Sequence, residues 1–498
     1  MKYPVKNVFI VGGTGFLGYY SALEFLKKGI NVSSASIPDV KLGDWFPKQI
    51  NIVSDNLDIF TETEDNLVKL FKGHDALVYA VGPDDRYTPP APSYDFFHEK
   101  LVVQCAKVLR AAKKAGVKRV SVLNSYFAYF DRQAEFNGIL SKHHPYIRVR
   151  REQAEACINE GEKGVMDVMI LELPYIFGSM PGRIPLWKSV FLDRFDKMPA
   201  VFFPKGGTVM IHVRGIAYAV VASILNGEHA TKYPIGDSNM KYKQMIRIMY
   251  DALNNKKKII NTPTWIAYLG GLFINRQEKK HGKQGGLDYA KLMTDIQSKD
   301  LFFTQETIDK VKSQLDYKGL GYDKELDVTE GIRTTIEACY PEKFPDSDPA
   351  NQVKEDLRII DEIFKKKADQ EKTVAAEKAP KSEAPDKPAE ESKPIAETAE
   401  IKKTAKSEKP VEVKKEAPVK IKADKPAEVK KEPAKAKAEK PVEKEAPIKA
   451  KAEKPAESKK TTPTKVADKK PAEVKKEQKK DDTKPAPAKK TSKPKADK

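Results

Sequence analysis

The sequence predicts an α/β fold, in which a parallel sheet is covered by helices on both faces, followed by a long tail without a core. Three observations predict this architecture. Apolar runs alternate with amphipathic segments over residues 1–180, a glycine-rich turn follows the first run, and the composition changes sharply at Lys365. Strands that alternate with helices are typical of parallel sheets, because each helix carries the chain back to the edge where the next strand begins.

The expected elements follow from the spacing of apolar residues. Short apolar runs bounded by glycine or polar residues predict strands, and apolar residues three or four apart predict helices. After Gly178 the pattern becomes less regular, with connections rich in proline and glycine, which is typical of a smaller lobe. The expected strands are residues 8–11, 30–34, 50–53, 76–81, 117–123 and 165–171, and the expected helices are residues 19–28, 65–72, 94–115, 149–159, 214–226, 242–253 and 329–338.

A glycine-rich turn lies between the first expected strand and the first expected helix. Its glycines, Gly12, Gly15 and Gly18 in VGGTGFLG, have the spacing G-x-x-G-x-x-G. In such a turn the first glycine permits a tight bend, the second lets a pyrophosphate approach backbone N–H groups, and the third lets the helix pack closely on the strand. The partial positive charge of the helix N-terminus then faces the phosphates. The turn therefore predicts a dinucleotide-binding domain.

This glycine spacing resembles that of the extended short-chain dehydrogenase/reductases, also called NAD-dependent epimerase/dehydratases. The resemblance implies a Rossmann-type doubly wound parallel sheet with a smaller C-terminal substrate lobe, and it implies NAD or NADP as the cofactor. We expect the dinucleotide-binding core in residues 1–178, the substrate-side lobe in residues 179–364 and a disordered tail in residues 365–498. The cofactor contacts that the resemblance implies are Gly12, Gly13, Thr14, Gly15, Phe16, Leu17, Gly18, Ser36, Asp55, Ala80, Val81, Gly82, Pro174, Tyr175 and Ile176.

The choice between NAD and NADP is expected at the end of the second strand, where an acidic residue binds the ribose hydroxyls of NAD and repels a 2′-phosphate. The sequence there is Ser33-Ser34-Ala35-Ser36, without a carboxylate, and no arginine follows to bind a 2′-phosphate. The absence of repulsion slightly favours NADP. Asp55, after the third strand, resembles the family's aspartate on the adenine side.

A serine, a tyrosine and a basic residue form the expected catalytic set. In the resembled family, a serine ends strand five, and a tyrosine with a lysine four residues later on the next helix carries the proton transfer. Here these positions hold Ser125, Tyr146 and Arg150, and Leu101 stands near the position of the asparagine on the family's preceding long helix. Residues four apart share a helical face, so the Arg150 cation can stabilise the Tyr146 phenolate. Tyr146 would then exchange a proton with the substrate oxygen, to which the Ser125 hydroxyl also bonds.

Residues after the sixth strand are expected beside the cofactor and the substrate. In LELPYIFG, Pro174, Tyr175 and Ile176 resemble the family stretch beside the nicotinamide ring. Arg183 in MPGRIPLW lies where the family varies its substrate loop, and two interpretations stay open: it binds an anionic substrate, or it pairs with a nearby carboxylate. No histidine has the paired spacing of metal ligands, so no metal site is expected.

The tail from Lys365 onward differs from the rest of the chain in composition and charge. It contains no aromatic residue, no glycine and no cysteine, and its 41 lysines outnumber 26 acidic residues, so most of the net charge of +19 lies there. Such a segment cannot bury a core and is expected to be disordered. Two roles stay open: a solubilising spacer, or weak and salt-sensitive binding of nucleic acid or other polyanions.

The remaining features predict a soluble protein of a reducing compartment, with the cytoplasm as the default. Cys105, Cys157 and Cys339 have no CxxC spacing, which argues against a disulfide framework or a structural zinc. The first residues lack the features of a signal peptide. The longest apolar run, residues 265–274, is too short to cross a bilayer, so no transmembrane segment is expected.

Three functions stay open. The leading one is an NAD(P)-dependent oxidoreductase, epimerase or dehydratase that acts on a small carbonyl compound or a nucleotide sugar, by hydride transfer with Tyr146 as acid or base. The second is a cofactor-binding regulatory module without catalysis, which the arginine at position 150 favours. The third is a nucleic-acid-associated protein that uses the basic tail. The resemblance also implies a homodimer formed through the helices at residues 94–115 and 149–159.

Overall fold

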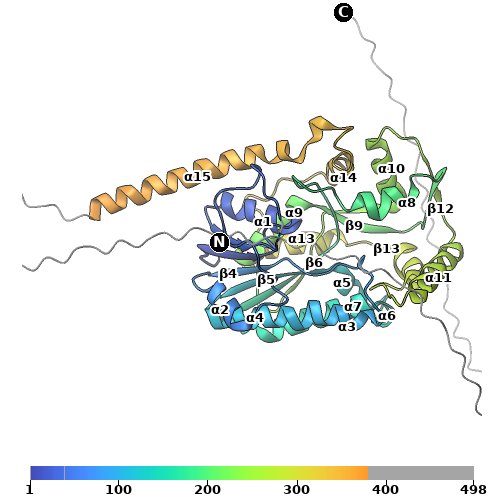
Figure 1. Ribbon diagram of the computed structural model, residues 1–498, viewed down its shortest axis with the longest axis horizontal. Helices are drawn as coiled ribbons and strands as arrows, with labels where there is room; N and C mark the ends of the chain where they lie inside the picture. Colours follow the sequence, from blue (N-terminus) through green and yellow to red (C-terminus); the bar gives the residue numbers. More distant parts are fainter. Residues whose placement is uncertain (1, 39, 379–498) are drawn as a thin grey trace, which may run out of the picture. The chain divides into compact units, whose positions relative to one another are not determined.

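A seven-stranded parallel sheet forms the centre of the protein in the computed structural model, which describes residues 2–38 and 40–378 (Figure 1). The strand order is β10-β6-β5-β4-β1-β2-β3, and every neighbouring pair is parallel. The order reverses at β1, which has β2 on one side and β4 on the other. The strands are β1 (Asn7–Val11), β2 (Asn31–Ala35), β3 (Ile50–Ser54), β4 (Ala76–Tyr79), β5 (Arg119–Ser125), β6 (Asp167–Leu173) and β10 (Lys232–Pro234).

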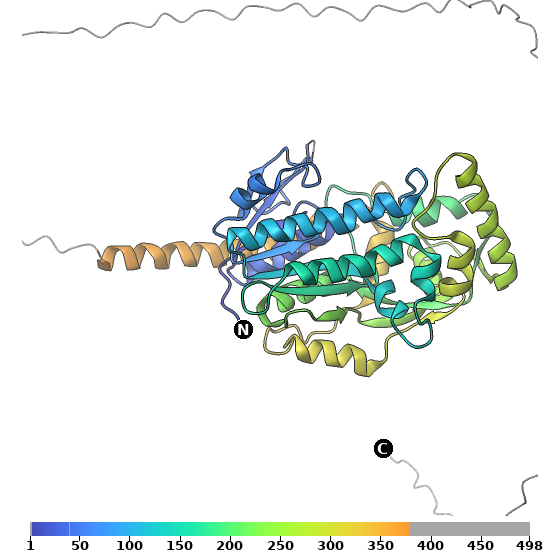
Figure 2. The same cartoon turned by 90° about the horizontal axis from the view of Figure 1, so that it is seen from below.

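Helices cover both faces of this sheet, so the predicted doubly wound fold class is confirmed (Figures 1 and 2). Side chains of β1 alternate between the faces: Val8 and Ile10 pack in one hydrophobic cluster, and Phe9 and Val11 pack in another. Burial on both faces explains why β1 and β4 are nearly continuous apolar runs. The first cluster includes α1 (Phe16–Lys27) and α9 (Val213–Asn226), and the second includes α2 (Glu64–Phe71), α4 (Gln104–Ala115) and α7 (Pro145–Glu160).

The predicted strands and helices of residues 1–180 are all present, with ends that shift by a few residues. The largest shift is in α7, which begins at Pro145 rather than at residue 149. Proline is favoured in the first turn of a helix because it has no N–H group to leave unpaired, and the early start places Tyr146 in that turn.

The long helix predicted at residues 94–115 changes its hydrogen-bond pattern in the middle. It consists of α3 (Ser93–His98), a π-helical segment (Glu99–Val103) and α4. A π-helical turn holds more residues than an α-helical turn and is frequently found at functional sites. Leu101, near the family's asparagine position, is fully buried within this segment.

Residues after β6 form a smaller lobe beside the central sheet (Figure 1). In this lobe β9 pairs with β7, β11 and β13, and β8 pairs with β12. The predicted boundary at residue 178 lies just after β7, yet α9 and β10 beyond it return to the central sheet. The further elements are β7 (Tyr175–Phe177), β8 (Ala200–Phe203), β9 (Gly207–His212), β11 (Ser238–Lys241), β12 (Lys258–Asn261), β13 (Asp300–Leu301), α5 (Tyr126–Asp131), α6 (Ile139–His143), α8 (Asp193–Phe195), α10 (Tyr242–Ala252), α11 (Thr264–Lys280), α12 (Tyr289–Lys291), α13 (Gln305–Gln314) and α14 (Val328–Glu337).

The last described helix, α15 (Pro349–Lys378), is attached to α1 and α9 by ion pairs. Asp356 lies 3.1 Å from Lys27 Nζ and 2.7 Å from Arg214 NH2. The helix continues past Lys365, so the change in composition falls inside a helix rather than at its end. Residues 365–378, which the sequence analysis assigned to the disordered tail, therefore belong to this helix. The rest of the predicted tail, from residue 379 onward, lies outside the described part of the chain, and so does its predicted polyanion binding.

Two of the three cysteines meet in the core. The Sγ atoms of Cys105 on α4 and Cys157 on α7 are 3.1 Å apart, and both side chains are fully buried. All three cysteines are free thiols. Their sequence separation gave no sign of this contact, because it depends on how α4 packs against α7.

Candidate active site

The glycine-rich turn has the geometry that a dinucleotide-binding loop needs. Gly12 has a φ of +95°, in the region that favours glycine. A Cβ on Gly18 would lie 2.1 Å from Gly12 O, so only glycine lets α1 pack this closely on the turn. The Ser34 hydroxyl accepts from Gly13 N–H (3.1 Å) and donates to Ile10 O (2.8 Å), which fixes the turn to β2. The first turn of α1 contains no acidic side chain, so its N–H groups fit an anionic pyrophosphate.

A cavity of about 1600 Å³ opens at the carboxyl ends of the central strands, between the sheet and the smaller lobe. Ligands of open α/β sheets bind where the strand order reverses, which here is between β1 and β4. Some predicted cofactor contacts are not among the described residues that line this cavity. They are Gly12–Gly15 and Gly18 of the turn, together with Ser36 and Asp55. The predicted site residues in the wall are Phe16, Leu17, Ala80, Val81, Gly82, Ser125, Tyr146, Arg150, Pro174, Tyr175, Ile176 and Arg183.

Tyr146 and Arg150 form a buried pair in the wall of this cavity. Arg150 Nε donates a hydrogen bond of 2.8 Å to the Tyr146 hydroxyl. The tyrosine is 4% exposed and the arginine 8% exposed. Because the phenol oxygen accepts from Arg150, its own proton stays available to a substrate oxygen.

Burial sets the protonation state of this phenol. Removal from water disfavours the phenolate and raises the pKa of Tyr146 to about 12, although the Arg150 cation opposes the shift. Tyr146 is therefore protonated at neutral pH. It can give a proton to a substrate directly, and it can accept one only with the help of the neighbouring cation.

Two residues that the sequence analysis missed, Asn124 and Gln153, connect this pair to β5. Arg150 NH1 donates to Gln153 Oε1 (2.8 Å), and Asn124 Nδ2 donates to the same oxygen (3.1 Å) and to Arg150 O (3.0 Å). Asn124 Oδ1 accepts from Ser125 N–H (2.7 Å). A buried network of this kind holds its members in fixed positions. The available signals were weak: Gln153 shares a helix face with Arg150, and Asn124 adjoins Ser125.

Ser125, the last residue of β5, lines the same cavity. Its Oγ accepts from Phe127 N–H (3.4 Å) and so caps the N-terminus of α5. A hydroxyl that accepts in this way keeps its hydrogen for a second partner. The side chain can therefore donate to a substrate oxygen while it holds α5.

A charged segment after β4 also lies in the cavity wall, and the sequence analysis missed it. Asp84, Asp85 and Arg86 follow Gly82, and Arg86 forms an ion pair with Asp84. Burial raises the pKa of Asp85, while Arg86 lowers it. The Asp85 carboxylate in turn raises the pKa of Tyr146. Three charged residues directly after a buried parallel strand were the signal, because ligands bind at that edge of the sheet.

Three predicted contact residues have other partners. Arg183 lines the cavity, but its guanidinium donates to Thr14 O (3.0 Å) in the glycine-rich turn rather than to a carboxylate. The backbone N–H of Ser36 donates to Ser54 O (2.8 Å), and the Ser36 side chain is buried. Asp55 is exposed. Arg183 therefore lies nearer to the predicted phosphate position than its place in the sequence suggested.

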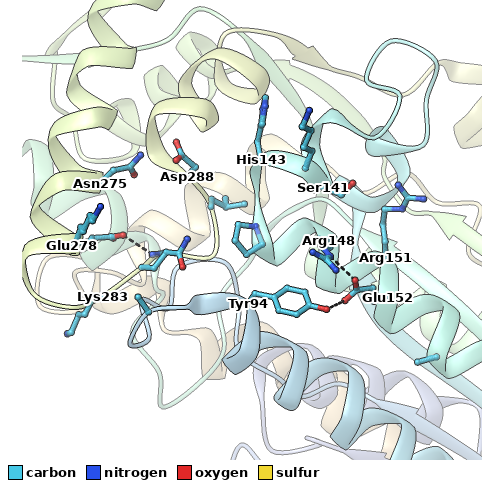
Figure 3. A pocket seen from close by; sticks show the side chains of 18 of the residues that line it. Tyr94, Ser141, His143, Arg148, Arg151, Glu152, Asn275, Glu278, Lys283 and Asp288 are labelled. Carbon is cyan, nitrogen blue, oxygen red and sulfur yellow. Dashed lines mark hydrogen bonds and ion pairs between the residues drawn. The ribbon is translucent and has the colours of Figure 1, made fainter. Parts of the chain in front are cut away.

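A second cavity, of about 1250 Å³, lies on the outer side of α7 (Figure 3). Several of its polar side chains have partners within the wall: Tyr94 OH and Arg148 Nε each donate to Glu152 at 2.9 Å, and Glu278 accepts from the backbone N–H of Gly285 at 2.7 Å. The predicted catalytic residues are not among the described residues that line it. The first cavity is therefore the candidate active site.

A comparison with protein families identifies an NAD(P)H-binding region in this chain. Residues 12–174 match the family model for NAD(P)H-binding domains. The match begins in the glycine-rich turn, ends after β6 and includes both Tyr146 and Arg150. A search of curated proteins finds no match to the sequence.

Solved structures resemble this chain at low sequence identity. The crystal structure of gox2253 is 16% identical, with a TM-score of 0.52, and the match covers 68% of this chain and 98% of that chain. WbmH of Bordetella bronchiseptica, solved in complex with NAD+, is 15% identical over 68% of this chain and 99% of that chain, with a TM-score of 0.47. UDP-glucose 4-epimerase of Thermotoga maritima, solved with UDP-glucose, is 13% identical. The match covers 68% of this chain and 99% of that chain, with a TM-score of 0.46.

Proposed function

We propose that this chain, whose residues 12–174 form an NAD(P)H-binding domain, is an NAD(P)-dependent enzyme that oxidises or reduces a small alcohol or carbonyl compound, or epimerises or dehydrates a nucleotide sugar. The observation that carries the proposal is the buried hydrogen bond of 2.8 Å from Arg150 to Tyr146. This pair lies in the wall of the cavity that the start of α1 also lines. A polar pair in such a place is suited to proton transfer.

The chain's own residues divide the binding and the proton transfer between them. The glycine-rich turn, the residues after β4 and the segment 174–176 would hold the cofactor, which supplies or accepts the hydride when bound. Tyr146 gives its proton to the substrate oxygen during reduction and takes one from it during oxidation. Ser125 donates a hydrogen bond to the same oxygen, which stabilises developing negative charge there.

Arg150 stabilises the phenolate that Tyr146 leaves when it has given up its proton. The guanidinium is held by Gln153 and by the carbonyl of Leu123, so its Nε stays directed at the phenol oxygen. Arginine keeps its charge at all relevant pH values and does not itself pass on a proton. Its role is therefore to position and to stabilise Tyr146.

NADP is the cofactor that this site would favour. The residues after β2 offer no carboxylate to bind ribose hydroxyls or to repel a 2′-phosphate. Titration of NADPH and NADH, followed by cofactor fluorescence, should give the lower Kd for NADPH. A lower Kd for NADH would contradict this preference.

The catalytic assignment is tested by NAD(P)H oxidation over a panel of carbonyl compounds and by epimerisation of UDP-sugars, with wild type, Tyr146→Phe and Tyr94→Phe. We expect Tyr146→Phe to lower turnover about 10²-fold to 10⁴-fold while the Kd for NAD(P)H stays the same. Tyr94→Phe is the matched control, because its hydroxyl binds Glu152 at the second cavity. Equal turnover in all three proteins would contradict the assignment.

Cofactor binding without turnover is the second candidate function. It is favoured by Arg150, which stands where the resembled family has a lysine. It is also favoured by Leu101, a buried apolar residue near the position of that family's asparagine. This function predicts NAD(P)H binding that Tyr146→Phe leaves unchanged, with no turnover of any compound in the panel. The same experiment therefore separates the two functions.

A further inference from the structure

Helix α11 exposes a row of large apolar side chains. Trp265, Leu269 and Phe273 are 65%, 54% and 62% exposed, and Ile266 and Ile274 are also exposed. At about 100° per residue these five positions fall on one half of the helix surface. We call these five residues the α11 face. An exposed apolar surface of this size on a folded protein marks a contact site.

Little of α11 is buried against the rest of the lobe. Gly271 is the one buried residue of this helix, all of which the structure describes, and it packs against the backbone of Tyr289 and Ala290. Asn275 Oδ1 accepts from Tyr289 N–H (2.9 Å). No side chain of α11 belongs to the hydrophobic clusters of the described residues. The helix thus contributes little apolar burial to the fold, so the α11 face is not there for packing.

The α11 face is continuous with the mouth of the candidate active site. Phe273 and Ile274 line that cavity, and so do the exposed side chains of Met198 and Phe202 from the chain around β8. Figures 1 and 2 show α11 at the end of the structure farthest from α15. Whatever covers the α11 face therefore also meets the cavity entrance.

The charges around α11 are strongly positive. Residues 254–283 contain seven lysines and arginines and one acidic residue, Glu278, which already accepts from Gly285 N–H. The cations precede the helix at Lys256 and Lys258 and follow the apolar residues at its carboxyl end, at Arg276 and Lys279. Apolar and aromatic side chains flanked by cations are typical of helices that lie in the interface of an anionic bilayer.

We propose that the α11 face and the neighbouring rim of the cavity bind the surface of a membrane that contains anionic lipids. Trp265, Leu269 and Phe273 enter the boundary between headgroups and acyl chains, and the flanking lysines and arginines bind lipid phosphates. None of the described helices is long and apolar enough to cross the bilayer, so α11 lies in its surface. The charge complementarity favours this partner over a second copy of the chain, whose own α11 face would bring like charges together.

The test is co-sedimentation of the full chain with vesicles of phosphatidylcholine that contain roughly one third phosphatidylglycerol, compared with pure phosphatidylcholine. The variant Trp265→Ser/Leu269→Ser/Phe273→Ser removes the centre of the α11 face. The matched control, Ile37→Ser/Val53→Ser/Val165→Ser, changes three exposed apolar residues elsewhere. The lysine-rich tail is present in every protein, so it cannot cause a difference between them.

We expect the wild type and the control to bind the anionic vesicles, and the α11 variant to bind them at least about tenfold more weakly. The emission of Trp265 should shift to shorter wavelength with vesicles, and Trp265→Phe should lose this shift. Equal sedimentation of wild type and α11 variant, or no binding by wild type, would overturn the proposal. So would a dimer without vesicles that the α11 variant converts to a monomer, because the face would then pair two copies. None of these measurements requires enzymatic turnover, so the result is independent of the proposed catalytic function.

Discussion

Helices α7 and α11 both border the candidate active site, but α7 buries polar side chains and α11 exposes apolar ones. α7 removes Tyr146, Arg150 and Gln153 from water and joins them by hydrogen bonds. α11 exposes Trp265 and Phe273 instead and buries little besides a glycine. Folding alone favours the reverse, with apolar groups inside and polar groups outside. The comparison teaches that each helix departs from that rule beside the cavity, which fits the proton transfer proposed for α7 and the membrane contact proposed for α11.

The largest effect on this comparison is expected from removal of the buried cation of α7. Arg150→Met keeps an unbranched side chain but takes a donor from Tyr146 OH and from Gln153 Oε1, so the free energy of unfolding should fall by about 2–3 kcal/mol. Turnover should fall with it. Urea denaturation measures the loss, and Arg276→Met on exposed α11 is the control, with a change within about 0.5 kcal/mol. Equal stability of both variants would remove the contrast between the helices.

A second test concerns the close packing of α11 at Gly271. A Cβ on Gly271 would lie 2.5 Å from Tyr289 O, so Gly271→Ala should lower the free energy of unfolding by about 2 kcal/mol. The neighbouring Gly270 has nothing within 4 Å, so Gly270→Ala should raise stability by up to about 1 kcal/mol through helix propensity. Thermal denaturation compares the two. Similar midpoints would mean that α11 is not held at Gly271.

The N-terminal end of α7 should respond to acid. His144 at the N-terminus of α7 accepts from Asp288 N–H, and burial lowers its pKa to about 4. In the unfolded chain, His144 has its ordinary pKa of about 6.5 and is protonated below that pH. Its contribution to stability is therefore complete above pH 6.5 and is lost as the pH falls toward 4.

Between pH 7 and 5.5, wild type should lose about 1 kcal/mol more stability than His144→Gln. The change with pH is the measured quantity, so any constant destabilisation by the substitution cancels. Parallel curves for wild type and His144→Gln would show that His144 does not respond to acid in this way.

The smallest effect on stability is expected at the α11 face. Trp265→Ser and Leu269→Ser replace exposed side chains, so each should change the free energy of unfolding by no more than about 0.5 kcal/mol. Denaturation of the free protein measures this. A loss above about 1 kcal/mol would mean that the face is covered in solution, and that the two helices do not differ in the way described above.

What the sequence predicted correctly depended on local spacing. The glycine-rich turn and the alternating strands predicted the parallel sheet, because each signal lies within a few residues. The approach of Arg150 to Tyr146 likewise followed from a separation of four residues on one helix. The start of α7 was misplaced because Pro145 was not recognised as a first helical residue.

What the sequence left undetermined depends on contacts between elements. Asn124 meets Gln153 only because β5 packs beneath α7, and Cys105 meets Cys157 only because α4 packs against α7. The π-helical turn around Leu101 has no simple sequence signal. For α11, the apolar run is visible in the sequence, but its exposure arises because no element of residues 2–38 and 40–378 covers it, and no local pattern records that.

The cavity of the candidate active site combines polar side chains such as Tyr146 and Arg150 with an apolar rim that includes Met198, Phe202 and Phe273. A ligand that covers the rim takes apolar surface out of water, so its binding carries a negative change in heat capacity. A ligand that reaches only the glycine-rich turn binds mainly through hydrogen bonds and charge, so its change in heat capacity on binding is smaller. The temperature dependence of the binding heat therefore reports which half of the cavity a compound occupies, before the chemistry of that compound is known.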